Sequence, residues 1–180
     1  NLNKRNNMGK SSQAKLSAED FKASVITDYV IAYRSRQASL LGRKEVLTGK
    51  AKFGIFGDGK ELPQIALAKV FENGDFRAGY YRDQTFALAT GIVTVEQLFG
   101  QLYANPSSEE DPHSGGRQMN NHFATRSLHA DGSWKKLKYQ KNTSADLSST
   151  AAQMPRSLGL ALASKKYREL QDKIGEDDFS

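Results

Sequence analysis

The chain has 180 residues, of which 26 are Lys or Arg and 20 are Asp or Glu, so its formal net charge is +6. This length can bury one hydrophobic core, and a single domain is the expected organisation. The absence of cysteine excludes disulfides and thiolate metal sites. No apolar run reaches the roughly 18 residues that a membrane-spanning helix needs.

The basic excess is concentrated in two places. Residues 1–16 contain Lys4, Arg5, Lys10 and Lys15 but no acid, and four lysines surround Trp134 and Tyr139. These lysines are Lys135, Lys136, Lys138 and Lys141. Because no nucleic-acid-binding fold is recognisable around them, we expect a disordered basic arm over 1–16 and a solvated loop around the lysines. A basic nucleic-acid-binding module is the alternative, and its binding would depend steeply on salt.

Local signals predict two consecutive helices in the first third of the chain. Ser17 is placed to cap a helix that runs to about Gln37, because acids follow in its first turn and apolar residues recur at helical spacing. A second helix is predicted over roughly 38–47, ending before Gly49. The apolar run at 53–56 has the character of a short strand.

The rest of the chain is predicted to be mainly helix and polar loop. Three further helices are expected, over residues 61–71, 94–103 and 151–170. Thr94 and Gln97 form a capping-box pattern at the start of the second of these. The segment 104–150 is mostly polar and long for a loop, so part of it is expected to bind something or to be disordered. Few runs have strand character, although an α/β domain requires several.

The run from Asp111 to His122 reads Asp-Pro-His-Ser-Gly-Gly-Arg-Gln-Met-Asn-Asn-His and has no core-forming pattern. Ordering such a loop has a high entropic cost, which favours a binding role. The run resembles the Gly-Gly-Arg-Gln-Met-Pro-x-His loop of the alpha subunit of the thiamine-diphosphate-dependent component of 2-oxo acid dehydrogenase complexes. Two more segments, Tyr80–Asp83 and Ser148–Pro155, resemble the aromatic-Tyr-Arg-Asp and Ser-Ser-x-x-x-Thr-Gln-x-Pro motifs of that family, in the same order.

This resemblance implies an α/β, thiamine-diphosphate-binding fold, of which residues 17–180 would be only the α-rich N-terminal portion with few strands. In the family the clear parallel strands and the metal-binding motif follow later, so the sequence is expected to be truncated before that motif. The triplet Gly57-Asp58-Gly59 looks like the magnesium-binding Gly-Asp-Gly, but Asn120-Asn121 follows far too late to complete that motif. We therefore interpret the triplet as a tight turn, and Glu61 as an acid in a first helical turn.

The resemblance also implies roles for individual residues. Tyr81 and Arg82 match the residues that hold the cofactor's diphosphate, with Asp83 orienting the arginine; a rigid hydroxyl and a planar fork suit this ligand. Ser148 and Thr150 match the lining of the aminopyrimidine pocket. The alternatives are core packing with a surface ion pair for the first pair, and helix capping for the second.

Three further positions bear on the site. His122 matches the motif histidine, and with Arg117 it is predicted to face a substrate or a partner subunit; a loop histidine satisfied by the backbone is the alternative. Ala152 stands where the family has a threonine that binds potassium, and its side chain offers no oxygen. No catalytic residue and no metal ligand are predicted within this chain.

The implied function is that of a subunit catalysing thiamine-diphosphate-dependent oxidative decarboxylation of branched-chain 2-oxo acids, with acyl transfer to lipoyl. The expected cofactors are thiamine diphosphate and magnesium, whose ligands would lie outside this chain. The expected partners are the beta subunit, which supplies the activating acid, and a lipoyl-bearing acyltransferase, in a cytoplasmic heterotetramer. A pyruvate dehydrogenase alpha subunit and a non-catalytic interaction domain are the alternatives.

Overall fold

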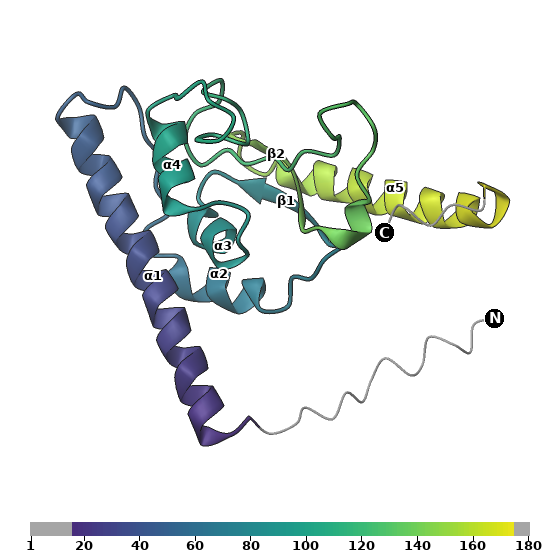
Figure 1. Ribbon diagram of the computed structural model, residues 1–180, viewed down its shortest axis with the longest axis horizontal. Helices are drawn as coiled ribbons and strands as arrows, with labels where there is room; N and C mark the ends of the chain where they lie inside the picture. The colour runs from purple at the N-terminus through teal and green to yellow at the C-terminus, as the bar shows by residue number, and fades with distance from the viewer. Residues whose placement is uncertain (1–15, 175–180) are drawn as a thin grey trace.

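The computed structural model describes residues 16–174 of the chain, so nearly all of the predicted arm at 1–16 lies outside the described residues. The elements are α1 (Ala18–Leu47), α2 (Glu61–Ala68), β1 (Phe76–Tyr80), α3 (Gln84–Ala89), α4 (Val95–Leu102), the 3-10 helix η2 (Leu137–Tyr139), β2 (Asn142–Leu147) and α5 (Gln153–Ile174). Figure 1 shows α1 along one side of the molecule and α5 on the opposite side, with the small sheet between them. None of the described helices is long and apolar enough to cross a membrane.

Helix α1 is one continuous element of 30 residues, not the two helices predicted. It begins as expected, because Ser17 Oγ accepts the backbone N–H of Asp20 at 3.0 Å. No proline interrupts the chain near residue 38, and alanine there is a strong helix former, so the predicted break does not occur. The apolar residues Phe21 and Tyr29 in its first half remain 61% and 66% exposed.

The core is small and lies where the second half of α1 meets α3 and α4. Its buried apolar members are Ala38, Ala87, Val93, Leu98 and Phe123. Many other buried side chains are polar, among them Ser35, Ser39, Gln84, Thr85, Gln101, Asn120 and Asn121. Because buried polar groups are costly unless they are hydrogen-bonded, this interior depends on side-chain amides that bond to the backbone.

Asn120 and Gln101 give the clearest examples of such contacts. Asn120 Nδ2 donates to the Ile55 carbonyl at 2.7 Å, and the Ile55 N–H donates back to Asn120 Oδ1 at 2.9 Å. The side-chain amide thus bonds to the backbone groups that a neighbouring strand would otherwise pair with. The strand predicted at 53–56 does not form. In the same way, the Gln101 side chain donates to the backbone carbonyl of His122 and accepts from its N–H. The polar segment 104–150 is therefore held by side chains from distant elements.

The other predicted helices form with small shifts in their ends. The capping box of Thr94 and Gln97 is confirmed, and α4 follows it. Helix α2 ends at Ala68, earlier than predicted, and α5 starts at Gln153 and reaches Ile174.

Neither strand of the sheet was predicted, and the sheet consists of two parallel strands. Phe76 pairs with Asn142 and Tyr80 with Leu147, with an irregularity after Ala78. Parallel pairing places the C-terminal ends of both strands at the same edge. The helix-rich architecture with a small parallel sheet is compatible with a portion of an α/β fold.

Glu61 at the start of α2 forms a bidentate pair with Arg36 of α1, at 2.7 and 2.9 Å. The hydrogen bonds from Arg36 lower the pKa of Glu61 to about 2 from its ordinary value of 4.5. A carboxyl whose pKa is lower in the folded chain stabilises it above pH 4.5, and this contribution is lost as the pH falls towards 2.

The free energy of unfolding of the wild type should fall as the pH is lowered from 4.5 to 2, because unfolding then takes up a proton at Glu61. We expect this free energy to fall less steeply in Glu61→Gln, by at most the slope that one proton contributes. Urea denaturation of both proteins at several pH values measures this slope. Parallel pH profiles for the wild type and the variant would contradict the assignment.

Candidate functional site at the strand ends

The parallel pairing of β1 and β2 brings together the two segments in which cofactor-binding residues were predicted. Tyr81 and Arg82 directly follow β1, whereas Ser148 and Thr150 follow β2. The Tyr80 hydroxyl interacts with the side chains of both Tyr81 and Thr150. The four predicted residues therefore gather at one edge of the sheet.

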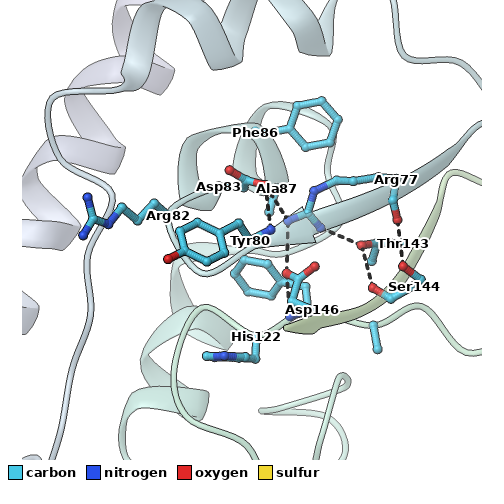
Figure 2. Close-up of polar contacts among 12 residues, drawn as sticks. Arg77, Tyr80, Arg82, Asp83, Phe86, Ala87, His122, Thr143, Ser144 and Asp146 are labelled. Carbon is cyan, nitrogen blue, oxygen red and sulfur yellow. Dashed lines mark hydrogen bonds and ion pairs between the residues drawn. The ribbon is translucent and has the colours of Figure 1, made fainter. Parts of the chain in front are cut away.

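Tyr81 and Arg82 lie together on this edge. The Arg82 guanidinium carbon is 5.4 Å from the centre of the Tyr81 ring. The hydrogen bond from Tyr80, together with the Arg82 charge, lowers the pKa of Tyr81 below its usual value. Among the carboxylates that the structure describes none pairs with Arg82, and its side chain points away from the neighbouring acids in Figure 2. This cation is thus available to an anionic ligand.

Asp83 does not orient Arg82, and that prediction was wrong. Its Oδ2 accepts from Arg77 Nη2 at 3.0 Å and from the Tyr80 N–H at 2.9 Å. The same Arg77 nitrogen bonds to Asp146 Oδ2 at 3.0 Å, and Arg77 Nη1 donates to Thr143 Oγ1 at 2.6 Å. The reason is geometric, since Arg77 comes from inside β1 and reaches both acids from within the fold (Figure 2).

Arg77, Asp83, Thr143 and Asp146 form one hydrogen-bonded cluster. Asp146 is its most buried carboxylate. Its side chain is 0% exposed, and its second oxygen, Oδ1, has no hydrogen-bond partner among the described residues. Burial raises the pKa of Asp146, although Arg77 and the Phe123 N–H oppose the rise. The cluster ties the loop after β1 to β2, and its buried charges favour one arrangement of the two.

Neither Arg77 nor Asp146 was singled out from the sequence. The only available signal was an arginine and an aspartate inside short segments that lack other strong features. A charged residue in a strand that turns out to be buried is informative only once its partner is known.

His122 lies between the glycine-rich loop and the end of β2. Its Nε2 is 2.5 Å from Ser148 Oγ, and its Nδ1 is 3.1 Å from the Asn120 carbonyl oxygen. The Tyr81 ring lies nearly parallel to the imidazole, with centroids 6.3 Å apart. The His122 side chain is only 4% exposed. It contacts two of the predicted cofactor-binding residues, Ser148 and Tyr81.

Arg117 borders a cavity of about 300 Å³ beside these residues, and the cavity is also lined by His113, Ser114, His122, Phe123 and Asp146. Its own Nε donates to the Ser114 carbonyl at 2.9 Å, and its side chain is exposed. The structure therefore places Arg117 and His122 on one cavity.

The Gly57–Gly59 turn supports the loop after β1. A Cβ atom at Gly57 would lie 2.3 Å from the Arg82 carbonyl oxygen, so only glycine allows this approach. Asp58 pairs with Arg43 at 2.8 Å. The contacts agree with the interpretation of this triplet as a structural turn.

The donors on this edge suit a ligand that combines negative charge with a polar ring. Arg82 supplies a cation, and Tyr81, Ser148 and Thr150 supply hydroxyl groups, whereas the nearby acids are turned towards Arg77. Among the described residues no group of three or more His, Asp or Glu could hold a metal ion. Arg82 and the three hydroxyl groups are thus the donors that this edge offers to a phosphate-bearing ligand.

The chain was compared with known proteins. No family model matches the chain. Over 124 residues, which are 68% of this chain, the sequence is 32% identical to the 2-oxoisovalerate dehydrogenase subunit alpha of Bacillus subtilis (strain 168). The matched part is 32% of that protein, so the chain spans about a third of its length.

Proposed function

Because the chain belongs to the family of 2-oxo acid dehydrogenase alpha subunits, we propose that it is part of an enzyme that decarboxylates a 2-oxo acid oxidatively with thiamine diphosphate. Its relative is named for 2-oxoisovalerate, which supports a branched-chain 2-oxo acid as substrate. Pyruvate is the alternative substrate. In this proposal residues 17–180 form part of the cofactor-binding domain.

The observation that carries the proposal is the convergence of Tyr81, Arg82, Ser148 and Thr150 at the ends of β1 and β2. The residues were selected from two short motifs that lie in different parts of the chain. Their meeting in space is what a shared ligand requires, and unrelated surface residues have no reason to converge in this way.

The residues fit the cofactor's chemistry. Arg82 would bind the diphosphate through paired N–H donors, and Tyr81 would add a hydroxyl donor. Ser148 and Thr150 would hydrogen-bond the aminopyrimidine ring. When bound, thiamine diphosphate supplies the electron sink for loss of carbon dioxide, and the chain's residues position it. Magnesium, in this proposal, is held by ligands outside residues 1–180.

The proposed partners are a beta subunit and a lipoyl-bearing acyltransferase that accepts the acyl group. Arg117 and His122 would face the substrate or the partner subunit across their shared cavity. The proposed assembly is a cytoplasmic heterotetramer. The exposed apolar residues of α1 are in keeping with burial against another subunit.

The proposal is tested by assembling the chain with a beta subunit and titrating thiamine diphosphate with magnesium by calorimetry. We expect saturable cofactor binding by the assembly and poor binding by the chain alone, since no magnesium ligand is proposed within it. Decarboxylation rates with 2-oxoisovalerate and with pyruvate then identify the substrate class. Micromolar binding by the isolated chain would contradict a site shared between subunits, and no binding by either preparation would contradict the function.

A further inference from the structure

The contact between His122 and Ser148 has the geometry of a general base and its nucleophile. The two atoms, Nε2 and Oγ, are 2.5 Å apart, which is within the reach that proton transfer requires. The other ring nitrogen, Nδ1, faces the Asn120 carbonyl oxygen at 3.1 Å. Since a carbonyl oxygen only accepts, we assign the proton to Nδ1, and Nε2 then presents its lone pair to the serine hydroxyl.

The imidazole is held in this orientation from several sides. Gln101 Nε2 donates to the His122 carbonyl at 2.7 Å, and the His122 N–H donates to Gln101 Oε1 at 3.2 Å. Asn120, whose carbonyl orients the ring, is itself clamped to Ile55 by two hydrogen bonds. A base fixed by a third group is the arrangement that activates a hydroxyl in catalytic triads. The buried amides thus orient His122 as the base.

Ser148 itself is accessible. It is exposed at the end of β2, whereas its base is buried behind it. Tyr81 faces the same imidazole, and Arg82 lies against Tyr81. An electrophile can therefore approach from solvent without moving the base.

We propose that His122 and Ser148 form a nucleophilic dyad, and that Ser148 accepts acyl groups from activated esters. The Ser148 Oγ–carbon bond forms as the bond from the carbonyl carbon to the leaving oxygen breaks. The hydroxyl proton passes to His122 Nε2 and then to the leaving group. The product is an acylated serine, and water attacking the same carbon restores it. This activity goes beyond the proposed function, because it needs neither cofactor nor beta subunit.

The experiment uses p-nitrophenyl acetate and the full chain. Release of p-nitrophenol is followed by absorbance, and the acetyl group is located by peptide mass spectrometry. We expect acetylation of Ser148, and Ser148→Ala and His122→Gln should each slow it by about 100-fold or more, the usual contribution of a general base. Ser149→Ala, at the next residue, and His129→Gln, an exposed histidine, are the matched controls and should react as the wild type does.

A comparison of two cysteine variants keeps the test decisive if His122→Gln fails to fold. In Ser148→Cys the same base should raise the rate of alkylation by iodoacetamide well above that of Ser149→Cys. Acetyl groups on lysines alone, or equal alkylation of the two cysteine variants, would overturn the dyad.

The proposed cofactor pocket includes Ser148, so thiamine diphosphate should protect this serine in the assembly with a beta subunit. Acetylation that the cofactor does not slow would support the dyad and count against Ser148 as a cofactor-binding residue. Protection of Ser148 would support both assignments.

Discussion

Arg77→Ala is expected to lower the free energy of unfolding by about 3–5 kcal/mol, the usual cost of removing one partner of a buried ion pair. The Arg77 side chain is 8% exposed and Asp146 is 0% exposed. Alanine would leave Asp146 and Asp83 facing each other without a counter-ion. Urea denaturation followed by circular dichroism measures the loss.

Arg126→Ala is the matched control for this prediction. Arg126 is exposed, and its side chain donates a 3.3 Å hydrogen bond to the Pro112 carbonyl, so we expect a loss below about 1 kcal/mol. Asp146→Asn should cost less than Arg77→Ala, because Arg77 keeps Asp83 as its partner. Similar losses for Arg77→Ala and Arg126→Ala would show that the cluster does not hold the fold together.

Arg82→Ala is expected to weaken thiamine diphosphate binding by the assembly by about 2–3 kcal/mol, or roughly thirty- to a hundred-and-fifty-fold. The reason is that Arg82 has no partner among the described carboxylates and would pair with the diphosphate. Because the side chain is exposed, the melting temperature of the chain should hardly change. Calorimetric titration and thermal melting measure the two effects separately.

Arg82→Lys distinguishes a paired contact from simple charge attraction. An ammonium keeps the charge but loses the planar fork, so only part of the affinity should return. Full recovery would indicate attraction without paired hydrogen bonds. An unchanged dissociation constant in Arg82→Ala would remove Arg82 from the site.

The features that could be predicted from the sequence depend on residues close together in the chain. Ser17 caps α1, and Thr94 with Gln97 forms the capping box of α4, because each contact spans only three residues. The continuity of α1 was missed, since two adjacent helical segments look the same whether or not they join. Only the surrounding structure decides between these possibilities.

The sheet and the interior could not be predicted in this way. The β2 segment reads Asn-Thr-Ser-Ala-Asp-Leu and has no apolar alternation, so it resembles a loop. Gln101 and Asn120 look like surface residues until their backbone partners are known. Where polar side chains replace apolar packing, composition loses its value as a guide to burial.

The site was partly predictable because motif resemblance identifies residue types but not their partners. Tyr81, Arg82, Ser148 and Thr150 were selected in advance, and they converge in the structure. The pairing of Asp83 with Arg77 instead of Arg82 was not foreseen. Adjacent residues on an irregular loop can point to opposite sides, and spacing alone does not reveal which side each one takes.

The parallel pairing of β1 with β2 has a consequence for the order in which the chain folds. Arg77 and Thr143, which are bonded across the two strands, are 66 residues apart in sequence. Helices such as α1 need only neighbouring residues, whereas this pairing must first overcome the entropy of closing a long loop. During synthesis, Tyr81 and Arg82 would leave the ribosome well before Ser148 exists. The candidate site thus assembles only after synthesis has passed Thr150.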